Sequence, residues 1–203
     1  MGFAPTTKGN NMSEINNFSG EYEFLNNGYL CPVVYEDEVY PSLEHAYQAA
    51  KTDDLDLREN IKSCLTVTDA RSNGKNVILA SDWQTKKLEI METLIRNKFN
   101  DNFDLKLKLV LTQNADLVQG NCRDTFWGQN KYNVGENHVG RLLEKIREEI
   151  IDQEGDFVDV LYKFLNSKKL GFVMDLIADG TIKAIIDEDN TEEEEEEEEA
   201  LDE

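Results

Sequence analysis

The carboxyl-terminal end of the chain is dominated by acidic residues. Thirteen of the 17 residues from Asp187 to Glu203 are Asp or Glu, and none is basic. Like charges at this density repel one another, so we expect this tail to be disordered and solvated. Its simplest role is solubility, and the alternative is that it binds a basic partner. The fold must therefore be built from the residues that precede the tail.

The rest of the chain has enough apolar residues for a core. Of all 203 residues, 39% are hydrophobic and 9% aromatic, which suits one compact domain with a small appendage. The formal net charge of −21 becomes −8 once the thirteen tail acids are set aside. An acidic body argues against bulk duplex DNA or an anionic membrane as the partner, because both bind surplus Lys and Arg. A small anionic metabolite in a local basic pocket is still compatible.

The cysteines and the hydropathy indicate a cytoplasmic protein without a metal. Cys31, Cys64 and Cys122 are odd in number and widely spaced, which favours reduced thiols. The two histidines do not cluster with them as zinc ligands would. No apolar run reaches the roughly 18 residues of a membrane-spanning helix. The first residues also lack the apolar stretch of a signal peptide.

The pattern predicts an α+β fold with several helices around a small β-sheet. β structure is expected over 22–40, where Val33–Tyr35 and Val39–Tyr40 flank a polar turn as in a hairpin. Helices are expected at 43–51, 53–64, 69–72 behind a Thr68 cap, 81–99 behind a Ser81–Gln84 capping box, 105–111 and 137–151, with a strand at 115–118. The predicted division is a loose leader over 1–16, a domain over 17–152, a helical extension over 153–186 and the tail over 187–203.

The segment Tyr40–Lys51, with the sequence YPSLEHAYQAAK, is the first candidate for chemistry. Glu44 falls in the first turn behind Ser42, where the helix dipole favours an ionised carboxylate. Tyr47, Gln48 and Lys51 follow at i+3, i+4 and i+7, so they share one polar face with Glu44. Acidic residues are also common in first helical turns for stability alone.

The segment Gly120–Gly128 lies in a loop rich in Gly, Asn and aromatic residues. Trp127 exposes a large apolar surface unless it stacks on something, and a planar base would suit. Asp124 is placed to address an attached sugar. The alternative, that Phe126 and Trp127 pin the loop to the core, is equally open on residue type.

The third segment starts at Gly135 with the sequence GENHVGRLL. Asn137 is expected to cap a helix, and a helix N-terminus can bind an anion. Arg141 or Arg147 would add positive charge. Ordinary helix capping explains the pattern equally well.

Together, the three segments resemble the NADAR superfamily, which includes the YbiA-like N-glycosidases. The resemblance covers about residues 22–150, and the order and spacing of the three motifs agree. In this family pattern Glu44 matches the catalytic Glu, while Asp124 and Trp127 match the Asp-x-x-Trp-Gly motif. Gln129 stands where the family usually has an Asp, and Gly28 stands in place of a Phe.

The resemblance implies hydrolysis of an N-glycosidic bond between a (phospho)ribose or ADP-ribose and a base or amine, without a cofactor. Glu44 would stabilise the oxocarbenium-like ribose or activate water, with Asp124 as a second catalytic carboxylate. The implied substrate-binding residues are Trp127, Trp83, Asn27, Arg71, Lys75 and Asn137. The alternative is an inactive sensor that binds a nucleotide or ADP-ribose and engages a partner through its tail.

Overall fold

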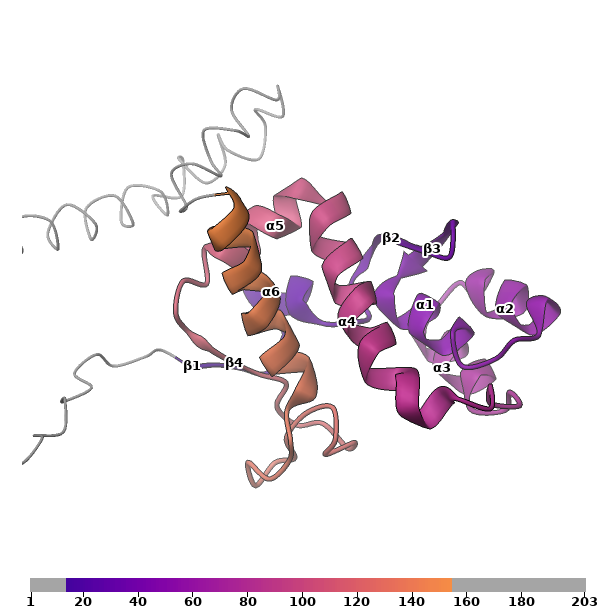
Figure 1. Ribbon diagram of the computed structural model, residues 1–203. Helices are drawn as coiled ribbons and strands as arrows, with labels where there is room; N and C mark the ends of the chain where they lie inside the picture. Colours follow the sequence, from indigo (N-terminus) through magenta and orange to yellow (C-terminus); the bar gives the residue numbers. More distant parts are fainter. Residues whose placement is uncertain (1–13, 155–203) are drawn as a thin grey trace, which may run out of the picture. The chain divides into compact units, whose positions relative to one another are not determined.

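The structure is a computed structural model that describes residues 14–154 (Figure 1). The predicted extension and acidic tail lie outside the described residues. The elements, in chain order, are β1 (Glu14–Asn16), the 3-10 helix η1 (Gly20–Leu25), β2 (Leu30–Tyr35), β3 (Glu38–Ser42), α1 (Leu43–Ala49), α2 (Leu55–Lys62), α3 (Val67–Gly74), α4 (Trp83–Asp101), α5 (Phe103–Val110), β4 (Asp116–Val118) and α6 (His138–Glu154). This arrangement confirms the predicted α+β class.

The strands form two small sheets instead of one. β2 and β3 pair antiparallel, and Glu36 and Asp37 make the connecting turn with positive φ angles of 48° and 63°. The predicted hairpin is therefore correct. β1 pairs in parallel with β4. The leader was predicted to reach residue 16, but residues 14–16 form β1 because β4 supplies their hydrogen-bonding partner.

Residues 22–25 were predicted to be β structure and instead belong to the 3-10 helix η1. Its residues Phe24 and Leu25 are buried in the core. The buried ammonium of Lys98 donates hydrogen bonds to the carbonyls of Phe24 and Asn26, at 2.6 and 2.8 Å. This long-range contact holds the end of η1 against α4.

The 19-residue helix α4 runs through the centre of the described residues (Figure 1). Met91, Leu94, Ile95 and Phe99 are fully buried along it, as their helical spacing predicts, whereas Leu88, predicted to lie on the same apolar stripe, is exposed. The predicted capping box at Ser81 is wrong, because the helix begins at Trp83 and its N-cap side chain makes no capping bond. Trp83 is itself buried, so its indole packs into the core at the first residue of the helix.

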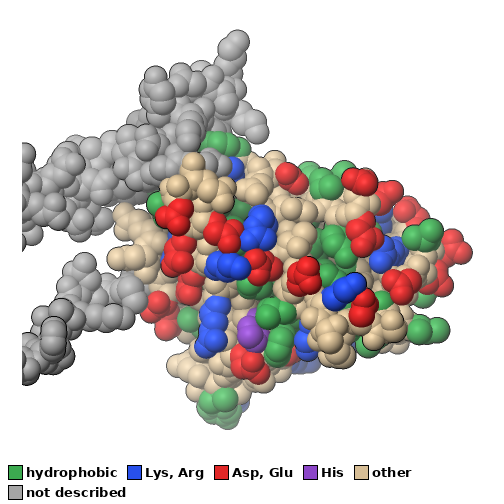
Figure 2. Space-filling view, viewed as in Figure 1, with side chains coloured by type: hydrophobic (Ala, Val, Ile, Leu, Met, Phe, Trp, Pro, Cys, Tyr) green, Lys and Arg blue, Asp and Glu red, His purple; other side chains and the backbone are tan. Residues whose placement is uncertain are grey.

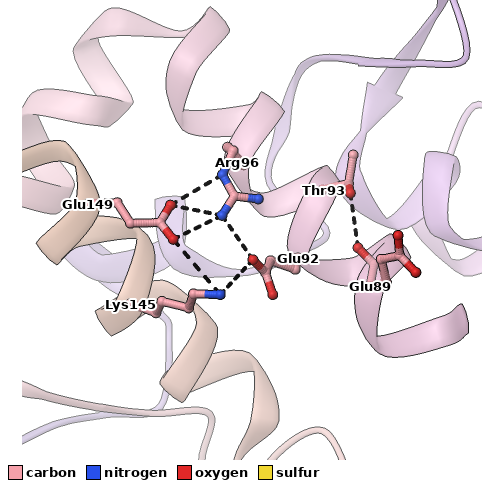
Figure 3. Close-up of polar contacts among 6 residues, drawn as sticks. All are labelled: Glu89, Glu92, Thr93, Arg96, Lys145 and Glu149. Carbon is pink, nitrogen blue, oxygen red and sulfur yellow. Dashed lines mark hydrogen bonds and ion pairs between the residues drawn. The ribbon is translucent and has the colours of Figure 1, made fainter. Parts of the chain in front are cut away.

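Ion pairs join α4 to α6 on the outside of this core (Figure 3). Arg96 Nη2 lies 2.9 Å from Glu92 Oε1 and 2.8 Å from Glu149 Oε2. Lys145 Nζ lies 2.8 Å from the same Glu92 oxygen. Several charges held together form a network, which stabilises more than isolated surface pairs do.

The first three helices begin at polar caps. Ser42 accepts a hydrogen bond from the backbone N–H of His45, which confirms the predicted cap of α1. Asp54 caps α2 in the same way. Helix α3 is capped by Thr66 and not by Thr68 as predicted, and it extends to Gly74. The longer α3 lies against α1, and its one basic residue, Arg71, reaches Glu44 of that helix.

On the face shown in Figure 2, acidic and basic side chains are interspersed over the described residues. That face presents no continuous basic stripe along which a nucleic-acid backbone would lie. Within residues 14–154, no helix is both long and apolar enough to cross a membrane.

Candidate active site

A pocket of about 630 Å³ opens between α1, α3, α4 and the loop that precedes α6. Its lining consists of Asn27, Glu44, Tyr47, Gln48, Lys51, Arg71, Lys75, Trp83, Gln84, Lys87, Met91, Gln119, Cys122, Arg123, Asp124 and Trp127. A volume of this size is typical of small-molecule sites.

Glu44 lies at the inner end of the pocket and is only 7% exposed. Its backbone N–H donates to the carbonyl of Asn27 at 2.8 Å, which ties the start of α1 to the segment after η1. The guanidinium of Arg71 contacts both carboxylate oxygens: Nε lies 3.0 Å from Oε1, and Nη2 lies 3.1 Å from Oε2. Hydrogen bonding to Glu44 raises the pKa of Arg71. The carboxylate is therefore buried but compensated.

The polar face predicted for α1 is present, and its residues are bonded to one another. Gln48 Nε2 donates to Glu44 Oε1 at 2.8 Å, and Lys51 Nζ donates to Gln48 Oε1 at 2.6 Å. Burial lowers the pKa of the Lys51 ammonium, while Glu44 and Asp124 oppose that shift. The chain of contacts leads from the buried carboxylate toward the basic mouth of the pocket.

Aromatic rings form one wall. Tyr47 lies between the two tryptophans, with ring centroids 5.2 Å from Trp83 and 5.6 Å from Trp127. Burial raises the pKa of the Tyr47 phenol, and the charges of Glu44 and Asp124 add to this effect. The phenol is therefore neutral at physiological pH. Such a wall offers apolar faces and edges to a planar group.

Asp124 enters the pocket from the loop and is exposed. Its Oδ1 accepts a hydrogen bond from the backbone N–H of Phe126 at 3.1 Å, which fixes the turn that presents Trp127. Trp127 also packs against Phe126, with centroids 4.8 Å apart. Lys87 from α4 lies over the Phe126 ring at 4.1 Å. The loop is thus attached to α4 through a cation–π contact.

The pocket is basic although the chain is acidic. Among the described residues, five basic side chains line it (Lys51, Arg71, Lys75, Lys87 and Arg123) against two acidic ones, Glu44 and Asp124. Since Arg71 is paired with Glu44, the positive charge that faces a ligand comes mainly from the other four. This concentration of charge favours an anionic ligand.

Seven of the eight site residues predicted from the sequence line this pocket, and Asn137 does not. Asn137 has a positive φ of 52°, and its amide bonds to β4: Nδ2 donates to the Leu117 carbonyl and Oδ1 accepts from the Gln119 N–H. A Cβ on Gly140 would lie 1.9 Å from the same Leu117 oxygen. The third motif therefore packs α6 closely on β4. Arg147, considered as an anion ligand, instead bonds to Thr112 and Ala115 in the interior.

Several lining residues have no local signal in the sequence. Lys87 lies one helical turn after Trp83 and therefore on the same face of α4. The prediction of Trp83 as a site residue is the only sequence signal that indicates this face. Gln84, Cys122 and Arg123 are likewise placed by tertiary packing. Within residues 14–154, no group of three or more His, Cys, Asp or Glu side chains is arranged to hold a metal ion.

The sequence of the chain is similar to that of known proteins. Residues 5–151 match the NADAR domain family. A riboflavin biosynthesis protein of Vibrio vulnificus is 34% identical over 149 residues, which are 72% of this chain and 40% of that protein. The N-glycosidase YbiA of Escherichia coli is 29% identical over 134 residues, 65% of this chain and 84% of YbiA.

The fold agrees with these matches. The NMR structure of E. coli YbiA superposes with a TM-score of 0.65 and 28% identity, covering 70% of this chain and 87% of YbiA. This chain spans only about 40% of the Vibrio protein, so the match there is to one part of a longer chain. The family match covers nearly all of the described residues, and the chain therefore belongs to the NADAR domain family.

Proposed function

We propose that this chain is an N-glycosidase that hydrolyses the bond between a (phospho)ribose or ADP-ribose and a base or amine. The single observation that carries the proposal is the buried carboxylate of Glu44, held by Arg71 and Gln48 at the inner end of a pocket with an aromatic wall. Similarity to proteins named N-glycosidase supports the same reaction class.

The chemistry follows from this arrangement. When the C1′–N bond breaks, its electron pair leaves with the nitrogen and the sugar carbon gains oxocarbenium character. An ionised carboxylate beside C1′ stabilises that charge or takes a proton from the attacking water. The water oxygen ends on C1′, and the leaving nitrogen gains a proton. We assign the first role to Glu44 and the protonation or sugar-orienting role to Asp124.

The two ends of the pocket fit the two ends of such a substrate. The wall of Tyr47, Trp83 and Trp127 suits a planar leaving group. Lys75, Lys87 and Arg123 also line the pocket and suit phosphate oxygens, which basic side chains bind through charge-assisted hydrogen bonds. Arg71 was expected to contact phosphate, and its pairing with Glu44 now favours an orienting role instead.

Two substrates are consistent with these features. One is a ribosylated pyrimidine of the riboflavin type, suggested by the name of the Vibrio relative. The other is an ADP-ribose derivative, whose two phosphates would use more of the basic side chains. A cytoplasmic location and a basic partner for the acidic tail also remain proposals.

The alternative of an inactive sensor rested on Gln129 and on the tail. Gln129 does not line the pocket. Its backbone N–H donates to the Gln119 carbonyl, and its carbonyl accepts from the Cys122 N–H. These two hydrogen bonds stabilise the loop. The replacement of the usual Asp at this position therefore removes no carboxylate from the pocket wall.

Hydrolysis in ¹⁸O-labelled water tests the proposal. The wild-type protein is incubated with a panel of ribose phosphates and ADP-ribose derivatives of bases, and the products are analysed by mass spectrometry. Cleavage at C1′ releases the base without ¹⁸O, whereas attack of water on the base would place ¹⁸O in it. Binding of a panel member without any base release would establish the sensor and contradict the enzyme.

A further inference from the structure

The amide of Gln48 joins the two charged ends of the polar face on α1. Its Nε2 lies 2.8 Å from Glu44 Oε1, and its Oε1 lies 2.6 Å from Lys51 Nζ. We propose that Gln48 is a positioning residue. Its amide donates a hydrogen bond to Glu44 Oε1, which leaves Oε2 as the oxygen that faces the reacting sugar. The inference rests on the proposed N-glycosidase function and assigns different roles to the two carboxylate oxygens of Glu44.

The orientation of this amide follows from the chemistry of its neighbours. A carboxylate only accepts hydrogen bonds, and an ammonium group only donates them. The amide nitrogen must therefore point to Glu44 and the amide oxygen to Lys51. The reversed orientation would place the amide oxygen against the Glu44 carboxylate, so that two acceptors meet. It would also place the amide nitrogen against the Lys51 ammonium, so that two donors meet. The Lys51 charge thus fixes which end of Gln48 meets the carboxylate.

The two oxygens of Glu44 are engaged unequally. Oε1 accepts a hydrogen bond from Gln48 Nε2 at 2.8 Å and also lies 3.0 Å from Arg71 Nε in the ion pair, so two nitrogens lie close to it. Within the described residues, Oε2 accepts only from Arg71 Nη2 at 3.1 Å. One acceptor position on Oε2 is therefore open to a water molecule or to C1′. Arg71 holds the plane of the carboxylate, and without Gln48 the hydrogen bond that engages Oε1 from the other side would be lost.

Packing keeps the amide in place. Gln48 is 6% exposed. Gly74, the last residue of α3, faces it so closely that a Cβ at this position would lie 2.1 Å from Gln48 Oε1 and 2.8 Å from Gln48 Cβ. The φ of Gly74 is not positive, so the glycine serves close approach and not an unusual backbone. Helix α3 therefore supplies both Arg71 and the space for Gln48.

Other charged groups also act on Glu44, so a test of Gln48 must leave those groups unchanged. The titratable groups around the carboxylate come from α1, α3 and its C-cap, α4 and the loop: His45, Tyr47, Lys51, Arg71, Lys75, Lys87, Cys122, Arg123 and Asp124. Substitution of Gln48 changes none of these charges. A neutral replacement consequently removes the hydrogen bond to Oε1, together with the one from Lys51 Nζ, without changing any charge.

Gln48→Met removes the donor with little change in volume. We expect kcat to fall about tenfold or more with KM nearly unchanged, because the lost contact orients a catalytic group and does not bind substrate. The acidic limb of the kcat/KM profile should move to higher pH, since a donor to the ionised carboxylate is lost. Gln153→Met, on the exposed end of α6, is the matched control and should behave like wild type.

Gly74→Ala tests the same contact without changing Gln48 itself. The added methyl group must displace the amide, so the variant should also lose kcat and shift the acidic limb. In a Gln48→Gly background both the amide and the Cβ of residue 48 are gone, so Gly74→Ala should then have no further effect on kcat. Equal losses in both backgrounds would show that Gly74 acts independently of Gln48.

The outcomes separate this inference from the function on which it rests. Wild type that releases no base from any panel substrate overturns the proposed function and the catalytic role of Gln48 together. Active wild type with unchanged kcat and an unchanged acidic limb in Gln48→Met overturns the inference about Gln48 alone. A lower Tm with no shift of the acidic limb would assign Gln48 a purely structural role, and this result also overturns the inference.

Discussion

Arg71 and Glu44 form a two-point ion pair across the contact between α3 and α1, with nitrogen–oxygen distances of 3.0 and 3.1 Å. The Glu44 side chain is 9% exposed, whereas that of Arg71 is 47% exposed. The guanidinium therefore compensates a buried carboxylate from the solvent side. This pairing fixes the plane of the carboxylate and leaves the basic residues nearer the mouth to meet an anionic substrate.

Arg71→Met should lower kcat by about 10²-fold, because an uncompensated buried carboxylate takes up a proton more readily and loses its orientation. Arg71→Lys should recover only part of that loss, since an ammonium group does not make the planar two-point contact. Steady-state kinetics of the two variants check this. Equal activity of Arg71→Lys and wild type would show that charge alone matters.

Trp127→Ala should weaken substrate binding more than Trp127→Phe. Stacking of a base on an aromatic ring contributes about 1–3 kcal/mol by alanine substitution in nucleic-acid systems, and Phe keeps part of it. Calorimetric titration with a substrate analogue measures the affinity. Trp127 also packs on Phe126 and Tyr47, so Tm is recorded for the same variants. A large loss of Tm with unchanged affinity would make Trp127 a scaffold residue.

Lys98 gives a prediction for pH dependence. Burial lowers its pKa to about 8 in the folded protein, whereas a lysine in the unfolded chain titrates near 10.5. Between these values the unfolded state binds more protons, so the free energy of unfolding should rise with pH relative to Lys98→Met. Urea unfolding of both proteins at pH 7, 8, 9 and 10 measures this difference. A difference that does not change over this range would place the folded pKa near its ordinary value.

Removal of residues 187–203 should leave turnover of small substrates unchanged. Charges in water are screened beyond about 8 Å at physiological salt, so we expect the thirteen acidic groups of this segment to have little effect on the pocket. The kcat/KM of the truncated chain on the best panel substrate is the relevant measurement. A truncated protein that binds substrate but no longer cleaves it would make the tail part of the site.

Local patterns predicted the parts of the site that depend on helical spacing. Glu44, Tyr47, Gln48 and Lys51 share a face because the i, i+3, i+4 and i+7 positions of a helix always do. The Ser42 cap and the hairpin before it are also determined within a few residues. These features need no knowledge of the rest of the fold.

Features that depend on tertiary packing were not predictable in this way. Arg71 meets Glu44 across 27 positions of sequence only because α3 packs on α1. Asn137 has the residue type of a helix cap, yet its amide is used by the backbone of β4. Lys87 and Arg123 look like ordinary surface residues until α4 and the loop bring them to one pocket.

The central claim is that the carboxylate of Glu44 carries the reaction. The most direct test is the kcat/KM of Glu44→Gln on the best substrate of the panel, with Glu148→Gln on the exposed face of α6 as the matched control. We predict a loss of about 10²-fold or more in Glu44→Gln, with retained substrate binding and an unchanged circular dichroism spectrum. A Glu44→Gln protein whose kcat/KM stays within about threefold of wild type would contradict the account, because a difference that small corresponds to less than about 1 kcal/mol of transition-state stabilisation.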